Sequence, residues 1–275
     1  MKVWLISGAS SGLGKQIAET VMQRGDFAIA SFRDAAAAAA FGQANPNRGH
    51  GVVMDVTRPD QVRAAVAEAV GLHGRLDVLV NNAGAGGFGA IEELPLEEFQ
   101  RQFSINVLGP IALTQAVLPT LRAQRSGMIF QMSSVSGMKA LPGLGAYGMS
   151  KFALEGFSES LAAEVAPLGI TVTIVEPGPF RTQWVQAAEP GARQEIADYA
   201  DTAHRQIAAL REMGGRQPGD PARAAAVIHE LSRQAAPPLR APLGPIAVDR
   251  IREKLAQVET DIAAWSHLTT TTNFQ

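Results

Sequence analysis

The chain has no cysteine, only five histidines and two tyrosines among 275 residues, and its 24 Lys and Arg nearly balance its 26 Asp and Glu. Without cysteine there can be no disulfide, thiol nucleophile or thiolate metal site, and the scattered histidines show no paired metal-ligand spacing, so we expect no metal centre. Nucleic-acid-binding proteins usually carry a basic excess, whereas the formal net charge here is −2. We therefore expect no nucleic-acid partner.

Long uninterrupted hydrophobic runs are also missing. The apolar run Val3–Ile6 stops at Ser7, below the roughly 7–15 residues of a signal-peptide core. Residues 102–121 are uncharged and could be mistaken for a membrane span. They are interrupted by two prolines and two amide side chains, at Asn106, Pro110, Gln115 and Pro119. We expect a cytoplasmic protein with no membrane association.

Short apolar runs alternate along the chain with segments of helical periodicity. The runs are apolar on both faces, as buried parallel strands are, whereas the helical segments carry apolar residues at i, i+3, i+4 and i+7. The expected strands are residues 2–7, 27–32, 51–55, 76–80, 128–132, 170–175 and 239–243, and the expected helices are 14–24, 34–44, 59–73, 96–121, 146–166, 220–234 and 246–265. This α/β alternation predicts one doubly wound domain over residues 1–275, with a parallel sheet of about seven strands and helices on both faces.

One long segment interrupts the alternation. Between about residues 178 and 218 no strand is expected, and aromatic and apolar residues alternate with polar ones over two expected helices. A long insertion after a core strand is often a lid over an active site. We expect this segment to cover the substrate.

A glycine-rich turn joins the first expected strand to the first helix. Its glycines have the spacing G-x-x-x-G-x-G, which differs from G-x-G-x-x-G and from a P-loop. Glycines at such a turn let the backbone approach a pyrophosphate, and the helix N-terminus supplies free N–H groups. We predict a nucleotide-phosphate site at Gly8, Ser10, Ser11, Gly12, Leu13 and Gly14.

Three further motifs follow in order: Asn81-Asn82-Ala83-Gly84, then Ser134, then Tyr147-Gly148-Met149-Ser150-Lys151. With the glycine turn they resemble the short-chain dehydrogenase/reductase family, in its compact branch of about 250–280 residues with one Rossmann-type domain. The resemblance runs from Lys2 to about Thr182 and is weak beyond. It implies an oxidoreductase that transfers hydride with a nicotinamide cofactor, since no side chain can donate one.

Tyr147 and Lys151 are four residues apart on an expected helix, so both side chains lie on one face. A tyrosine is a poor acid or base at neutral pH, and we expect the nearby ammonium to lower its pKa. Ser134 follows a strand and can face the same crevice. The resemblance implies that Tyr147 transfers the proton, that Ser134 binds the substrate oxygen, and that Asn106 holds a helical kink and a water relaying protons through Lys151.

The resemblance implies that the cofactor is a nicotinamide dinucleotide, NAD(H) or NADP(H). Arg33 and Asp34 stand side by side after the second strand, one suited to the 2′-phosphate of NADP and the other to the ribose of NAD. By resemblance the deciding acidic residue of NAD enzymes ends the second strand, where this chain has Phe32 followed by the basic Arg33. NADP(H) is therefore favoured, and NAD(H) remains an alternative. The resemblance places further cofactor contacts at Asp55, Val56, Asn81, Asn82, Ala83, Gly84, Pro177, Gly178 and Thr182, besides Tyr147 and Lys151.

The substrate pocket is expected to be apolar. Its lining would include Ser134, Met138, Leu141, Phe180 and Trp184, which favours an uncharged hydrophobic alcohol or carbonyl compound. Two other functions compete with a dehydrogenase: a non-catalytic dinucleotide-binding sensor on the same fold, and an epimerase or dehydratase that also uses Tyr-x-x-x-Lys. The resemblance further implies a homodimer or homotetramer formed through residues 96–121 and 146–166.

Overall fold

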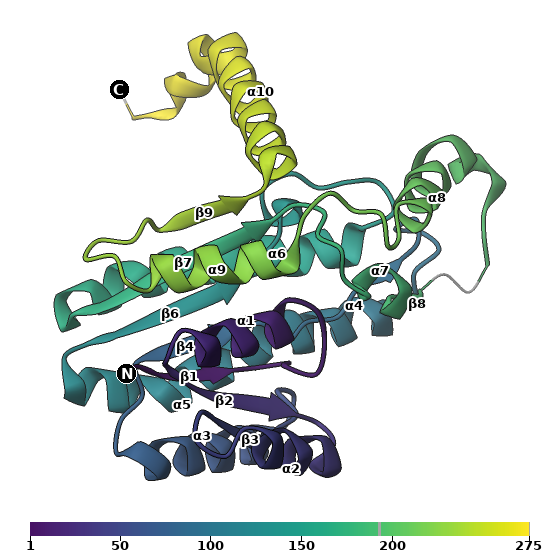
Figure 1. Cartoon of the computed structure of the whole chain (residues 1–275). Coiled ribbons are helices and arrows are strands. Elements are labelled where there is room, and N and C mark those ends of the chain that lie inside the picture. The colour runs from purple at the N-terminus through teal and green to yellow at the C-terminus, as the bar shows by residue number, and fades with distance from the viewer. Residues whose placement is uncertain (192–193, 275) are drawn as a thin grey trace.

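The structure, a computed structural model, describes residues 1–191 and 194–274. Seven parallel strands form one sheet in the order β3-β2-β1-β4-β6-β7-β9 (Figure 1). Their bounds are β1 Val3–Ile6, β2 Phe27–Phe32, β3 Gly49–Val53, β4 Val78–Asn81, β6 Gly127–Met132, β7 Ile170–Pro177 and β9 Arg240–Leu243. The order reverses between β1 and β4, and a crevice at such a switch point is where open α/β sheets bind ligands.

Helices cover both faces of the sheet, which confirms the predicted α/β fold class. The side chains of α1 and α9 pack on one face, and those of α3, α5 and α6 pack on the other. The helices are α1 Gly12–Gln23, α2 Ala35–Ala44, α3 Pro59–His73, α4 Leu96–Phe103, α5 Gly109–Gln124, α6 Gly145–Val165, α7 Trp184–Ala187, α8 Arg205–Glu212, α9 Pro221–Leu231 and α10 Pro245–Thr269.

The first strand shows why the buried runs are apolar throughout. Val3 and Leu5 point into the core under α3 and α5, whereas Trp4 and Ile6 point into the core under α1 and α9. Alternate side chains of a strand face opposite sides, and both sides here are covered. All four side chains are therefore buried.

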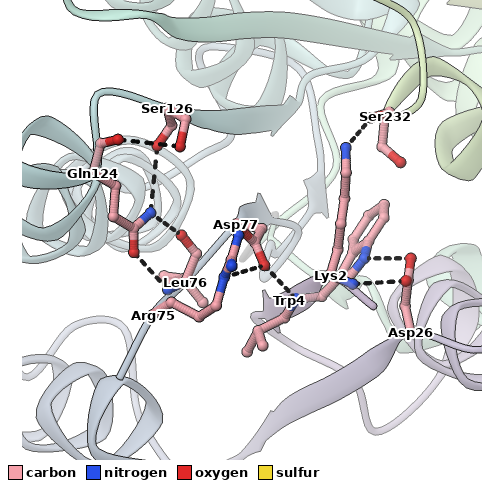
Figure 2. Close-up of polar contacts among 10 residues, drawn as sticks. Lys2, Trp4, Asp26, Arg75, Leu76, Asp77, Gln124, Ser126 and Ser232 are labelled. Atoms are coloured by element: carbon pink, nitrogen blue, oxygen red, sulfur yellow. Dashed lines mark hydrogen bonds and ion pairs between the residues drawn. The ribbon is translucent and has the colours of Figure 1, made fainter. Parts of the chain in front are cut away.

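Two aspartates fasten the amino ends of the strands (Figure 2). Asp26 accepts a hydrogen bond of 2.8 Å from the backbone N–H of Lys2 and one of 3.2 Å from the indole of Trp4. Asp77 accepts one of 2.8 Å from the backbone N–H of Val3 and pairs with Arg75. These hydrogen bonds lie at the amino ends of the strands. The residues of the sequence motifs follow the carboxyl ends, at the opposite edge of the sheet.

Three elements differ from the sequence-based expectations. β3 lies two residues earlier than expected, at Gly49–Val53, and the single expected helix 96–121 is interrupted by a π-helical turn at Ser104–Leu108. The segment 178–218 contains a short strand, β8 Glu189–Pro190, which pairs with β5 Gly87–Phe88. The sequence around Phe88 does not predict this pairing, because a two-residue strand is too short to show the alternation of apolar and polar residues.

The stretch from α4 to α5 is long and apolar enough to cross a membrane by length and composition alone, and 44% of its most apolar window is buried inside the fold. The α5 residues Leu113, Val117 and Leu121 belong to the core under the sheet. The apolar character of this stretch thus serves packing against the strands.

A buried carboxylate fixes the 178–218 segment to the rest of the fold. Oε1 of Glu93 accepts hydrogen bonds of 2.7 Å from the backbone N–H of Ile196 and from the ring of His204. The hydroxyl of Tyr199 donates to Glu92 at 2.5 Å. Two adjacent glutamates thus anchor the far half of the segment.

Candidate active site

The glycine turn is shaped by two close approaches. Gly8 has φ +68°, and a Cβ there would lie 2.8 Å from Cα of Ala83. A Cβ on Gly14 would lie 2.3 Å from the carbonyl oxygen of Gly8, so α1 packs directly against the turn. The side-chain amide of Asn82 donates to the carbonyls of Ser7 at 2.9 Å and Gly8 at 3.0 Å. The turn is therefore held in shape from the end of β4.

A cavity of about 820 Å³ opens above the carboxyl ends of the strands. Its wall begins at the glycine turn, runs past the ends of β2, β3, β4 and β6, and reaches α6 and the 178–218 segment. The predicted residues in this wall are Gly8, Ser10, Ser11, Gly12, Leu13, Arg33, Asp55, Val56, Asn82, Ala83, Gly84, Ser134, Leu141, Tyr147, Lys151, Pro177, Gly178, Phe180, Thr182 and Trp184. Gly14 lies behind the turn, where it permits the close packing of α1.

This wall fits a dinucleotide. The first-turn N–H groups of α1 have no acceptor within their own helix, and an anion can use them. The side-chain-free backbone of Gly8 and Gly12 borders the same space. The residues at the ends of the first strands would hold the cofactor, and those near Tyr147 would hold the substrate.

Ser134, Tyr147 and Lys151 meet at the wall of the cavity. Tyr147 and Lys151 project from α6, and Ser134 follows β6 at the start of a short 3₁₀ turn. The ammonium of Lys151 lies 5.7 Å from the centre of the Tyr147 ring and donates to the carbonyl of Met132 at 2.7 Å. The backbone N–H of Ser136 donates to Oγ of Ser134 at 3.1 Å, which orients that hydroxyl.

Burial dominates the acid–base properties of this group. It raises the pKa of Tyr147 to about 12, and a hydrogen bond with Ser134 opposes the rise only in part. It lowers the pKa of Lys151 to about 8, against the opposing effect of the Glu155 carboxylate. The expected lowering of the tyrosine pKa by the ammonium is thus wrong in this structure, because the effect of burial dominates and the Lys151 ammonium donates to the Met132 carbonyl.

Asn106 lies outside the cavity wall, at the π-helical turn between α4 and α5. Its amide donates to the carbonyl of Ala85 and to Oγ of Ser150, each at 2.9 Å, and accepts from the N–H of Ala85 at 2.8 Å. It therefore connects the loop after β4 to α6, which carries Tyr147. A π-helical turn interrupts the helix at Asn106, and the water relay through Lys151 stays a prediction.

Arg33 and Asp34 are oriented differently. Arg33 lines the cavity, whereas the carboxylate of Asp34 accepts a 2.7 Å hydrogen bond from the backbone N–H of Ala37 and caps α2. Asp55 also lines the cavity, and its Oδ1 accepts hydrogen bonds from the backbone N–H and the hydroxyl of Thr57. Of the two candidate specificity residues, only the arginine reaches the cavity wall.

Two expected contacts need correction. Met138, expected in the substrate pocket, packs instead against Val135, Ala247 and Ile251, because the chain turns away after the 3₁₀ turn. Asn81, expected beside the cofactor, is the last residue of β4 and its side chain points into the buried interior. There its side-chain amide donates to Thr114 and Gln131 at 3.0 Å each. Neighbouring side chains along a strand point to opposite sides, so Asn82 faces the glycine turn and Asn81 faces the interior.

Sequence reasoning missed other wall residues. Arg101 of α4 borders the cavity and is held by two hydrogen bonds to Glu98 and one to the carbonyl of Gly86. Gln217, between α8 and α9, and Arg250, near the start of α10, also border the cavity. No motif marks these positions, since only the folding of distant segments brings them to the cavity.

An ion cluster lies behind Lys151. Arg240 of β9 binds the buried carboxylates of Glu155 and Glu176 and the exposed one of Glu159. Burial raises the pKa of Glu176 to about 7 although Arg240 opposes the rise, and burial also raises the pKa of Glu155. Burial disfavours the charged form of Arg240, but its carboxylate partners outweigh this effect and raise its pKa. One arginine therefore compensates two buried acids.

Comparison with known proteins agrees with this geometry. A family model described as short chain dehydrogenase matches residues 2–193. The chain is 36% identical over 248 residues to a 3-ketodihydrosphingosine reductase of Bacteroides thetaiotaomicron, covering 89% of this chain and 88% of the relative. It is 36% identical over 209 residues to an NADPH-dependent 3-dehydrocapnine reductase of Ornithobacterium rhinotracheale, covering 73% and 74%.

A crystal structure of a short-chain dehydrogenase from Streptomyces avermitilis superposes with a TM-score of 0.90 at 40% sequence identity, covering 99% of both chains. The chain therefore belongs to the short-chain dehydrogenase/reductase family. The members of this family are oxidoreductases whose fold binds a nicotinamide dinucleotide. The relatives are named as reductases, which supports an oxidoreductase that acts on a CH–OH group.

Proposed function

We propose that the protein is an NADP(H)-dependent oxidoreductase that interconverts a hydrophobic secondary alcohol and its carbonyl compound. The observation that carries this proposal is the meeting of Ser134, Tyr147 and Lys151 in one cavity that continues to the glycine turn. The bound nicotinamide would supply or accept the hydride. The names of two relatives, both reductases of keto compounds, support the carbonyl chemistry.

The residues of this chain would handle the proton. In reduction, the hydroxyl of Tyr147 donates its proton to the carbonyl oxygen, which also receives a hydrogen bond from Ser134. In oxidation, the phenolate of Tyr147 takes the proton from the alcohol. The Lys151 ammonium, 5.7 Å from the centre of the Tyr147 ring, would stabilise that phenolate.

The direct test mixes the protein with NADPH and a panel of apolar ketones and aldehydes, and follows the absorbance of reduced nicotinamide. We expect oxidation of NADPH with at least one of them, and a preference for compounds with long apolar groups. The wall supports this preference, since Leu141 and Trp184 border the cavity and pack in the same apolar cluster as Tyr147. Tight NADPH binding with no turnover of any compound would contradict the proposal and favour a sensor.

The pKa of Tyr147 predicts different pH profiles for the two directions. Because that pKa is raised to about 12, the tyrosine is protonated at neutral pH, which is the form that reduction needs. We expect the rate of alcohol oxidation to increase from about pH 7 to about pH 10 as the phenolate fraction grows, and that of ketone reduction to stay nearly constant, because the hydroxyl remains protonated over this range. Initial rates in both directions across this range check the prediction. Parallel profiles would show that another group controls the proton.

The choice of NADP(H) rests on Arg33, since Asp34 is engaged at the start of α2. A charge-assisted hydrogen bond from a guanidinium to a phosphate contributes about 1.5–3 kcal/mol. Changing Arg33 to Ala should therefore lower kcat/KM for NADPH by about 10- to 100-fold and leave that for NADH nearly unchanged. Steady-state kinetics with each cofactor measure this.

Asp34→Asn is the matched control, because asparagine also caps a helix and should leave the NADPH to NADH ratio as it is. An equal loss with both cofactors in Arg33→Ala would show that Arg33 does not read the 2′-phosphate. A loss of NADH activity confined to Asp34→Asn would favour NAD(H) instead.

A further inference from the structure

The C-terminal helix α10 leaves the body of the protein after its second turn (Figure 1). Its first part is anchored, since Ala247 and Ile251 are buried and Glu253 pairs with Lys139 at 2.5 Å. Beyond that point large apolar side chains are exposed. The exposed fractions are 55% for Leu255, 38% for Val258, 56% for Ile262 and 60% for Trp265.

These apolar side chains have the spacing of a coiled-coil seam. From Ile251 they follow at Leu255, Val258, Ile262 and Trp265, in alternating steps of four and three residues. Such a repeat of 3.5 residues keeps one narrow stripe facing a partner helix, and the neighbouring charged positions select the partner and its direction. The stripe begins with the buried Ile251 and continues where the protein itself offers no cover.

The charges beside the stripe change sign along the helix. Arg252 and Lys254 flank its first half, whereas Glu259 and Asp261 flank its second half, and no Lys or Arg follows Lys254 in the sequence. A parallel in-register copy would bring only Lys254 against Glu259, which gives two ion pairs by symmetry, whereas an antiparallel copy also brings Arg252 and Asp261 against opposite charges and gives four. Charge complementarity therefore identifies the partner.

An antiparallel second copy matches both the apolar and the charged positions in one register. When Leu255 lies opposite Val258 of the second copy, Ile251 lies opposite Ile262. In that same register the flanking positions place Arg252 opposite Glu259, and Lys254 opposite Asp261. The arrangement has twofold symmetry, so each of these contacts occurs twice.

We propose that α10 forms an antiparallel two-helix coiled coil with α10 of a second copy of this chain. The twofold axis crosses the helix near Ala256 and Gln257. The two bodies then lie at opposite ends of the helix pair, and each cavity stays with its own chain. This contact is separate from α4, α5 and α6, where the sequence resemblance placed an interface.

A membrane surface is the main rival partner for such a stripe. Helices that lie on membranes are usually basic on their polar face, because they bind anionic headgroups. The exposed second half of α10 carries Glu259 and Asp261 and no basic residue other than His267. The charges thus favour a second copy of the helix.

The first experiment measures the molar mass of the full chain by size-exclusion chromatography with light scattering. We expect Leu255→Glu with Ile262→Glu to halve the mass, while circular dichroism and cofactor binding are retained because both side chains are exposed. Leu72→Glu, on the exposed side of α3, is the control that should leave the mass unchanged. An unchanged mass in the double variant, or a wild-type monomer at all concentrations, overturns the proposal.

The second experiment tests whether the flanking charges hold the two helices together. Arg252→Glu with Lys254→Glu, and Glu259→Arg with Asp261→Lys, should each lower self-association, because each places like charges opposite one another. Mixing the two variants should restore the wild-type mass as a heterodimer, because the opposed charges are then complementary. Failure of the mixture to recover overturns the antiparallel pairing.

Two further outcomes would also overturn it. The chain has no cysteine, so Thr269→Cys introduces a single thiol near the end of the helix. Rapid disulfide formation between two copies would show a parallel pair, since an antiparallel pair holds these thiols at opposite ends. Sedimentation of the wild type with phosphatidylglycerol vesicles, abolished by Leu255→Glu with Ile262→Glu, would assign α10 to a membrane surface.

Discussion

Changing Tyr147 to Phe is expected to lower kcat by about 10²- to 10⁴-fold, the usual contribution of a positioned acid or base, and to leave NADPH binding nearly unchanged. The substitution removes one hydroxyl from a ring that packs at 4.8 Å against Trp184. The ring packing survives, so the loss reports proton transfer. Single-turnover rates with the best ketone, together with a binding titration of NADPH, measure the two effects separately.

Tyr199→Phe is the matched control, since Tyr199 is the second tyrosine of the chain and its hydroxyl donates to Glu92 away from Tyr147. We expect at most a change in KM for this variant. If Tyr147→Phe kept more than about a tenth of the wild-type kcat, the proton would have to come from another group. The assignment of Tyr147 as the acid would then fail.

Arg240→Leu is expected to lower the free energy of unfolding by about 3–5 kcal/mol near neutral pH, because it leaves two buried carboxylates without their shared cation. Arg240 binds Glu155 and Glu176 behind Lys151, so the variant should also disturb the alignment of α6. Urea unfolding followed by circular dichroism measures the loss. A change below about 1 kcal/mol would show that the cluster contributes little.

The pH dependence of this loss has a definite sign. Burial raises the pKa of Glu176 to about 7 and that of Glu155 above its usual value. A carboxyl group with a raised pKa in the folded state stabilises the fold at low pH, and this stability is lost as the pH rises through the folded pKa. Without Arg240 both carboxylates become harder to ionise, so the deficit should be larger at about pH 8 than at about pH 5.

Glu159→Gln provides the control for this cluster. Glu159 also binds Arg240, but its carboxylate is exposed, and exposed ion pairs contribute about 0–1 kcal/mol. We expect little change in the free energy of unfolding at either pH. A large loss in this variant would mean that the exposed pair, and not the buried acids, explains the effect of Arg240→Leu.

The sequence predicted the sheet well because each buried strand is an unbroken apolar run. Val3–Ile6 illustrates this, since both faces of β1 are covered and no polar residue interrupts the run. The motif residues were also predictable, because strand ends at one edge of a parallel sheet must converge. Ser134, Tyr147 and Lys151 accordingly reach one cavity from β6 and α6.

Other features depend on contacts that local sequence does not encode. Met138 is apolar and close to Ser134 in sequence, yet a 3₁₀ turn directs it toward Ala247 of α10. The π-helical turn at Asn106 forms because the amide reaches Ala85 and Ser150, which lie far away in the chain. The pKa of Tyr147 follows from its burial and from its hydrogen bond with Ser134, and the spacing of residues within a helix predicts neither.

The attachment of the 178–218 segment through Glu93 has a consequence for how this chain can vary. Glu93 holds Ile196 and His204 from the loop that follows β5, whereas Asn82 holds the glycine turn from the end of β4. The two sets of hydrogen bonds share no residue, so the 178–218 segment and the glycine turn are held in place separately. We expect sequence changes near Trp184 in this segment to alter the cavity wall while the Asn82 contacts of the glycine turn are kept.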